Sequence, residues 1–207
     1  MCCQYYILPK GVEWDPIRES VEKVPLLLRF EDAGAALITS GTVRPTNVVP
    51  VLATDRHGGQ SLFPMRWGFR SEGARPINLL NARVETAAKK PTFREAWFRH
   101  RCAVPASGYY EWERNVSEDG KRKTGPKYAI QAEDTPIIWL CGLYRIEQGL
   151  PVFVILTRTP GENLARIHDR MPLILPEPSI REWIDPSVPP ETLLDQAILD
   201  LYAEKAS

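Results

Sequence analysis

The chain has 207 residues, of which 43% are hydrophobic and 25% charged, and its 26 basic residues balance its 26 acidic ones. This length and apolar content suit one domain with a full hydrophobic core, and the balanced charge argues against indiscriminate binding of polyanions. No apolar segment is long enough to span a bilayer and the N-terminal residues lack a signal-peptide pattern, so we expect a cytoplasmic protein without a membrane partner.

Segments rich in aromatic and β-branched residues, bounded by proline and glycine, predict short strands along the chain. These segments are residues 2–8, 47–53, 60–69, 102–112, 127–132, 136–146 and 151–157. Apolar residues at helical spacing predict helices between and after them. The predicted helices are residues 14–23, 84–100, 160–167, 178–184 and 190–204. Pro190 suits the first turn of the last one.

Many short strands with peripheral helices predict an α+β fold. We expect a single domain over residues 1–207, built mainly from an antiparallel, barrel-like β-sheet, with the C-terminal helix at about 190–204 packing on it. No repeat, low-complexity linker or change of composition divides the chain.

The cysteines show neither CxxC spacing nor a matching set of Cys and His ligands, so we expect no metal site and no disulfide framework. They are Cys2, Cys3, Cys102 and Cys141. Cys2 and Cys3 have a plain interpretation as small apolar residues entering a strand. Removal of Met1 would nevertheless give Cys2 a free α-amine beside its thiol, and no internal cysteine offers that pair.

Polar side chains interrupt the predicted strands and helices at three further places. They are Asn78, Asn81, Arg83 and Glu85, then Glu111 in an aromatic run, then His168, Asp169 and Arg170. Each has an ordinary explanation, because Asn81 could cap a helix, Glu111 could face solvent and His168 could lie in a turn. Together they supply the amide, carboxyl, imidazole and guanidinium groups of an acid–base active site. Their spacing in the sequence does not by itself show that they lie close together in the folded protein.

Basic residues alternate with aromatic ones over 93–101, which includes Arg94, and a second basic segment covers 121–127. This combination suits single-stranded nucleic acid, whose bases stack and whose phosphates pair with cations. Taken alone, the first segment is better explained as a solvated amphipathic helix.

Several motifs in order resemble the SRAP family, the SOS-response-associated peptidases, from Cys2 to about Leu175. They are the N-terminal Met-Cys, then MRWGF, NARVET, VPASGYYEW and IHDRMPLIL. Members of this family sense abasic sites in single-stranded DNA and crosslink to them through the N-terminal cysteine. The resemblance implies a monomer that uses no cofactor and joins the nucleoid when DNA is damaged.

The resemblance also implies a role for each matching residue. Cys2 would be the nucleophile, and Asn81 would hydrogen-bond the cysteine and the sugar. Glu111 would act as the acid–base group, and His168 would help to open the deoxyribose ring. The residues implied in DNA binding are Arg83 and Arg170 at phosphates, Trp112 and Trp67 along the groove, Pro45 near the gap in the strand, and Arg94 and Thr157.

Two departures from the family pattern concern DNA binding. The family usually reads Met-Cys-Gly-Arg, whereas Cys3 and Gln4 follow Cys2 here, so one expected cation is missing. The segment RSEGARP after MRWGF also lacks the aromatic residues often found there, which indicates a different groove wall.

The aminothiol explains why the cysteine should stand at position 2. An α-amine with a pKa of about 7.7–8.0 is roughly 15% free base at pH 7, against roughly 0.04% for lysine. Such an amine condenses with an aldehyde, and the neighbouring thiol then closes a thiazolidine ring. A cysteine at position 3 would have no free α-amine and could not form this ring.

Two other functions fit part of the same evidence. An N-terminal cysteine peptidase or amidohydrolase would use Cys2 against an amide and turn over many substrates. A noncatalytic single-stranded DNA-binding module would use the basic segments and tolerate replacement of Cys2.

Overall fold

The computed structural model describes residues 3–8, 11, 13–73, 75–116 and 122–206. Five strands close into a barrel at its centre: β3 (Val48–Thr54), β4 (Gln60–Trp67), β8 (Arg101–Ala106), β11 (Ile138–Glu147) and β12 (Leu150–Arg158). Antiparallel pairs join β4 to β3, β3 to β8, β8 to β11 and β11 to β12. The ring closes where β12 runs parallel to β4.

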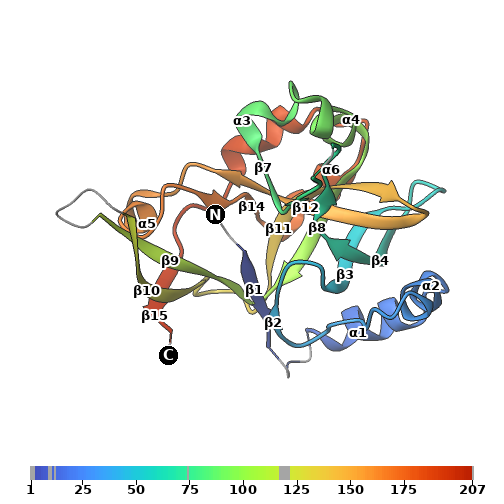
Figure 1. Ribbon diagram of the computed structural model, residues 1–207, viewed down its shortest axis with the longest axis horizontal. Helices are drawn as coiled ribbons and strands as arrows, with labels where there is room; N and C mark the ends of the chain where they lie inside the picture. Colours follow the sequence, from blue (N-terminus) through green and yellow to red (C-terminus); the bar gives the residue numbers. More distant parts are fainter. Residues whose placement is uncertain (1–2, 9–10, 12, 74, 117–121, 207) are drawn as a thin grey trace.

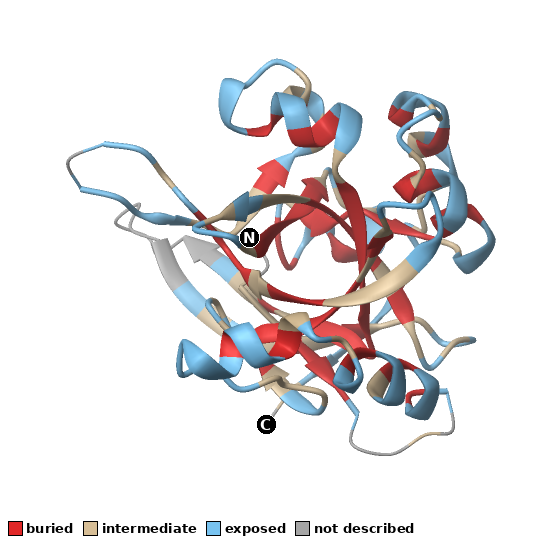
Figure 2. Cartoon of the chain, turned by 90° about the vertical axis from the view of Figure 1, so that its right-hand side faces the viewer, coloured by how far each residue is buried: buried red, intermediate tan, exposed pale blue. Residues whose placement is uncertain are grey.

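The barrel strands are buried because their sequences are almost continuously apolar. Every residue of β8 is buried, and so is every residue of β12 except its two ends. Such strands have packed side chains on both faces. Figure 2 shows their buried residues in red. One set of side chains fills the barrel, and the other packs beneath the helices.

A second antiparallel sheet of five strands lies beside the barrel in Figure 1. Its order is β15 (Tyr202–Lys205), β10 (Arg122–Gln131), β9 (Gly108–Val116), β1 (Gln4–Ile7) and β2 (Gly41–Val43). Tyr5, Tyr109 and Tyr128 join its inner face to the central core. Strand β9 continues from β8 after Ser107, so the barrel sets its position.

Short strands bring distant segments to the C-terminal end of β12. On one side, β7 (Asn81–Arg83) pairs with it in parallel, with Arg83 opposite Thr157. On the other side, β13 (Met171–Pro172) pairs with it, with Pro172 opposite Thr157. The remaining short strands are β5 (Phe69–Arg70), β6 (Asn78–Leu79) and β14 (Ile174–Leu175). Two of the polar motifs therefore meet at β12.

Helices cover the outside of the barrel. They are α1 (Asp15–Glu22), α2 (Leu26–Asp32), α3 (Val84–Ala87), α4 (Pro91–Arg99), α5 (Glu162–Ala165), α6 (Glu177–Ile184) and a 3-10 helix (Pro190–Gln196). In Figure 1, α1 and α2 lie at the lower right, and α3, α4 and α6 lie at the top. No helix in the described part of the chain is long and apolar enough to cross a bilayer.

The α+β, mainly antiparallel and barrel-like fold predicted from the sequence is confirmed, and each predicted strand exists. The helix predicted over 84–100 is two helices, because Pro91 begins a new one. The helix predicted over 190–204 is wrong. Only 190–196 is helical, as a 3-10 helix, and Tyr202–Lys205 is a strand. The backbone of Tyr202–Lys205 pairs with the edge of β10, and this pairing makes the segment a strand in spite of its helical pattern.

Candidate active site

Glu111 is buried inside the protein, although glutamate is usually found at the surface. It sits in β9 opposite Tyr128 and is only 4% exposed, so the interpretation that it faces solvent is wrong. Burial raises the pKa of Glu111, because a carboxylate loses the hydration that stabilises its charge. The side chain therefore holds its proton to a higher pH than an ordinary glutamate and can serve as an acid.

His168 faces Glu111 from the loop between α5 and β13. The two side chains are both buried, and His168 Nε2 lies 3.8 Å from Glu111 Oε1. Burial lowers the pKa of His168 to about 4, so its ring is neutral at pH 7. The backbone N–H of Arg170 donates to His168 Nδ1 over 3.0 Å. The Arg170 carbonyl oxygen lies 3.1 Å from the same nitrogen, so Nδ1 has both a donor and an acceptor beside it, while Nε2 faces Glu111.

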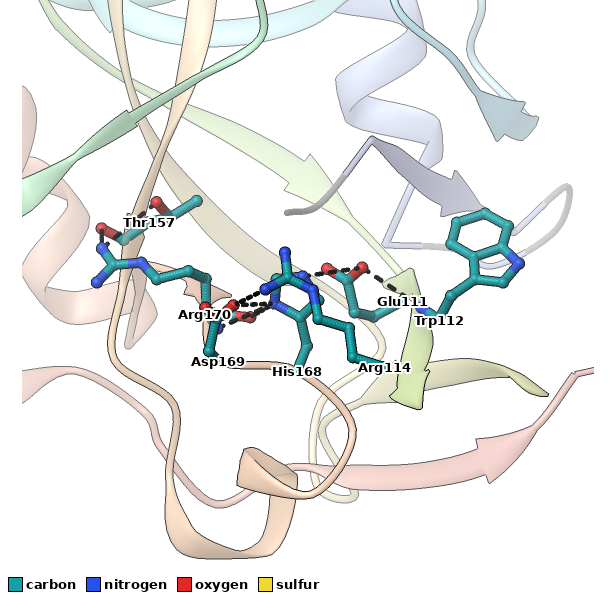
Figure 3. A network of polar contacts seen from close by, with 7 residues as sticks. All are labelled: Glu111, Trp112, Arg114, Thr157, His168, Asp169 and Arg170. Carbon is teal, nitrogen blue, oxygen red and sulfur yellow. Dashed lines mark hydrogen bonds and ion pairs between the residues drawn. The ribbon is translucent and has the colours of Figure 1, made fainter. Parts of the chain in front are cut away.

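Arg114 and Asp169 join the strand of Glu111 to the loop of His168. Arg114 Nη1 lies 2.7 Å from Asp169 Oδ1, and the Arg114 backbone N–H donates to the carbonyl of Ile167. Burial opposes ionisation of Asp169, but its interactions with Arg114 and His168 outweigh burial and lower its pKa. Asp169 Oδ1 is also 3.1 Å from His168 Nδ1. Since Arg114 already balances this carboxylate, a neutral His168 is compatible with it. Figure 3 shows these groups together.

The first strand leads the N-terminal segment to the same place. Gln4 pairs with Tyr110, so Cys3 comes alongside Glu111 in the register of β1 and β9. Burial and then the charge of Glu111 raise the pKa of the Cys3 thiol, which agrees with this position. Cys2, the predicted nucleophile, lies outside the residues that the structure describes.

Asn81 is half-buried in β7 and pairs with Ile155 of β12. The interpretation as a helix cap is wrong, because Arg83 is the residue that precedes the first turn of α3. Asn81 instead belongs to β7, which pairs in parallel with the C-terminal half of β12, where β13 also arrives after the His168 loop.

Arg170 is held by Glu85 at the rim of this region. Its two terminal nitrogens lie 2.7 and 2.9 Å from the two carboxylate oxygens of Glu85, and one also donates to the Thr157 carbonyl. The hydrogen bond from Arg170 is the main reason that the pKa of Glu85 is lowered, and exposed Arg83 adds to the effect. Sequence reasoning noted Glu85 but did not find this two-point pair, which joins positions 85 residues apart.

The comparison with known proteins covers nearly the whole chain. Residues 1–206 match the family model described as SOS response associated peptidase (SRAP). The chain belongs to the SRAP family. This agrees with the resemblance seen in the separate motifs.

Two bacterial relatives carry the name abasic site processing protein. YoaM of Bacillus subtilis is 33% identical over 178 residues, covering 79% of this chain and 76% of that protein. YedK of Escherichia coli is 33% identical over 145 residues, covering 67% of this chain and 63% of that protein. A solved phage-related protein of Bordetella bronchiseptica shares the fold, with a TM-score of 0.70 at 21% identity over 99% of this chain and 95% of that one.

Two of the residues that the SRAP resemblance implies at the DNA are enclosed in the fold. Trp67 has no exposed surface and stacks on Phe153 at 6.2 Å, so its ring belongs to the core. Thr157 is equally buried, and its hydroxyl donates to the carbonyl of Ala82. In this structure the Trp67 ring packs in the core and Thr157 accepts a hydrogen bond from Arg170, and contact of either residue with DNA stays a prediction.

The other implied DNA-binding residues of this SRAP domain reach the surface. Trp112 is half-buried in β9. Pro45 is half-buried in the turn that follows β2, and β2 is the strand that pairs with β1. Arg94 is exposed on α4, at the upper right in Figure 1, whereas β9 lies at the left. Arg94 is thus not brought together with Glu111. Within the described residues no cluster of three or more metal-binding side chains occurs.

Proposed function

We propose that this protein processes abasic sites in single-stranded DNA by joining Cys2 covalently to the lesion. Membership of the SRAP family and the names of the relatives support abasic-site processing. The observation that carries the chemistry is the buried Glu111–His168 pair, with 3.8 Å between them, at the start of β1. It supplies proton-transfer groups where the N-terminal segment enters the fold.

The first step is condensation of the Cys2 α-amine with the open aldehyde of the abasic site, after removal of Met1. The amine nitrogen bonds to the aldehyde carbon, and the resulting carbinolamine loses water to give a Schiff base. Departure of the hydroxyl requires a proton. Glu111 suits this task because its raised pKa lets it hold a proton to a higher pH than an ordinary glutamate, and His168 Nε2, 3.8 Å away, can take part in the proton transfer.

The second step is attack of the Cys2 thiol on the carbon of the Schiff base. A carbon–sulfur bond forms, the thiol proton goes to the former imine nitrogen, and a thiazolidine ring results. The whole sequence releases one water and needs no oxidant, reductant or cofactor. Because Cys2 is consumed, each chain reacts once, which distinguishes this activity from that of a peptidase.

Intact-protein mass spectrometry tests the proposal. Untagged protein is incubated with single-stranded DNA containing one abasic site. We expect a species lacking Met1 and heavier by the mass of the DNA less one water. The Cys2→Ala variant should give none, whereas the matched Cys3→Ala variant should react normally. Cys2→Ser keeps the amine, so borohydride should still trap its Schiff base.

Other outcomes point to the competing functions. Repeated cleavage of a peptide by a Cys2-dependent reaction, without a DNA adduct, would identify a hydrolase. DNA binding that is unchanged in Cys2→Ala, again without an adduct, would identify a noncatalytic binding module. An N-terminal tag that leaves adduct formation intact would refute the α-amine mechanism.

A further inference from the structure

A groove lies between the two N-terminal helices and the chain that follows them. It has a volume of about 650 Å³ and is lined by the end of α1, by α2 and by residues of the segment 34–39. We call it the α2 groove. In Figure 1, α1 and α2 lie at the lower right, whereas β9, which carries Glu111, lies at the left. A ligand in the α2 groove would therefore leave the candidate active site open.

The lining of the α2 groove is mainly apolar. Leu27 is buried, Leu37 and Ala35 are half-buried, and Ala36 is exposed. Gly34 follows α2 with a φ of 75°, and a Cβ at this position would meet nothing within 4 Å. The groove therefore opens to solvent at the end of α2.

Backbone hydrogen bonds hold the walls of the groove in place. The Ala35 N–H donates to the carbonyl of Phe30 in α2 over 2.9 Å, and the Ile38 N–H donates to the carbonyl of Val48 in β3 over 2.8 Å. Leu37 also forms a parallel bridge with Val48. The segment is thus tied to the helix and to the barrel, so the groove exists before a ligand binds. A preformed site lowers the entropic cost of binding.

The charged side chains that line the α2 groove are carboxylates. Glu22 and Glu31 are exposed and line it from α1 and α2, and none of the described residues that line it is basic. Residues 13–32, which include both helices, contain six acidic and three basic residues, although the whole chain has no net charge. Negative charge is therefore concentrated at these helices.

The three cations of residues 13–32 are engaged away from the groove carboxylates. Arg18 and Lys23 pair with carboxylates of α1 at 3.2 and 3.6 Å. The guanidinium of Arg29 lies at the turn between β11 and β12. Neither Glu22 nor Glu31 forms an ion pair with a residue that the structure describes. Their charges are available to a partner.

An exposed leucine lies beside these carboxylates. Leu28 of α2 is 63% exposed. It precedes Glu31 by three residues and Asp32 by four, so both are its neighbours on the helix surface. Apolar surface bordered by charged groups is typical of sites that bind another protein.

The charge and shape of the α2 groove match one class of ligand. Its carboxylates repel the phosphates of a nucleic acid and of an anionic membrane surface. An apolar groove with an acidic rim complements a helix that has leucines on one face and lysines or arginines beside them. We propose that the α2 groove binds a basic amphipathic helix of a partner protein, with an apolar side chain between Leu27 and Leu37 and cations at Glu22 and Glu31. This goes beyond the proposed function and does not depend on it.

Fluorescence anisotropy tests the α2 groove with a labelled helical peptide of leucine and lysine, spaced so that its leucines share one face. We expect the full chain to bind this peptide saturably, and not the same peptide with glutamate in place of lysine. Glu22→Gln/Glu31→Gln should weaken binding about fivefold to tenfold at low salt. Leu28→Ser should weaken it about twofold to threefold. The matched control is Glu177→Gln/Glu182→Gln on α6, which removes an equal charge and should change binding little.

Three results would overturn the proposal. One is the absence of saturable peptide binding, or equal affinity for native protein and Glu22→Gln/Glu31→Gln. Another is a dimer of native protein in sedimentation that this double variant abolishes, which would assign the groove to a second copy of the chain. The third is displacement of the peptide by an undamaged single-stranded oligonucleotide. Adduct formation with abasic DNA should be equal in native protein and the double variant, so failure of the proposed function would show separately.

Discussion

The loop that carries His168 touches two glutamates in opposite electrostatic environments. Glu111 is 4% exposed and burial raises its pKa, whereas Glu85 is half exposed and its hydrogen bond to Arg170 lowers its pKa. A glutamate side chain therefore keeps its proton to a higher pH than usual at one end of the loop and loses it at a lower pH than usual at the other. The comparison supports the proposed role of Glu111 in proton transfer, whereas Glu85 holds the guanidinium of Arg170.

Glu111→Gln should give the largest effect, because it removes the buried carboxyl group whose raised pKa suits it to carry a proton. We expect the rate of adduct formation to fall about a hundredfold, in the lower part of the range for general acid–base catalysis. In the native protein the rate should also fall as the pH rises through the raised pKa of Glu111. That alkaline decline should disappear in the variant. Single-turnover assays across pH measure both quantities.

A matched control for that experiment is Glu113→Gln, two residues along the same strand, which contacts Tyr128 rather than His168. It should retain the native rate and pH profile. An unchanged rate in Glu111→Gln would remove Glu111 from the reaction and leave its burial without a catalytic role.

His168 should make the folded protein sensitive to acid. Its folded pKa of about 4 lies below its ordinary value of 6.5, so between these values the unfolded chain binds a proton that the folded chain does not. Stability is therefore lost as the pH falls through this window, by about 1–3 kcal/mol near pH 4. Urea unfolding at pH 7 and pH 4.5 should show a smaller loss for His168→Gln than for native protein.

The exposed His57 offers the control for this acid effect. His57→Gln should keep the native difference in unfolding free energy between the two pH values. If His168→Gln loses as much stability in acid as native protein does, the proton uptake belongs to another group.

Asp169→Asn should have a moderate effect, because it breaks the ion pair that joins the Glu111 strand to the His168 loop. A partly exposed pair contributes about 0.2–1 kcal/mol, so we expect adduct formation to slow about twofold to fivefold. The separate variant Arg114→Lys keeps the positive charge and should retain most of the native rate. A rate in Arg114→Lys as slow as in Asp169→Asn would show that the planar guanidinium, and not the charge, is required.

Glu85→Gln should have the smallest effect and the opposite sign. It removes a negative charge beside Arg83 and Arg170, so affinity for single-stranded DNA should rise about twofold to threefold at low salt and converge with the native value at high salt. Anisotropy titrations at two salt concentrations measure the change, with Glu95→Gln on α4 as a matched control. Weaker binding instead would mean that Arg170 needs Glu85 to hold it in place.

The local sequence was sufficient to predict the strands and the types of residue that form the site. Alternating and continuous apolar runs determined strands such as β9 and β12, and the polar groups of Glu111 and His168 stood out against them. The order of the motifs also determined the family. These features depend on neighbours in the chain, which a sequence displays directly.

Only the tertiary structure decided which of these groups meet and which are enclosed. The pairing of β7 and β13 on β12 places Arg170 over Thr157, and the closed barrel buries Trp67. The edge of β10 turned Tyr202–Lys205 into a strand against its helical pattern. Each outcome depends on contacts between residues far apart in the chain, and the register of those contacts is set by the packing of the whole domain.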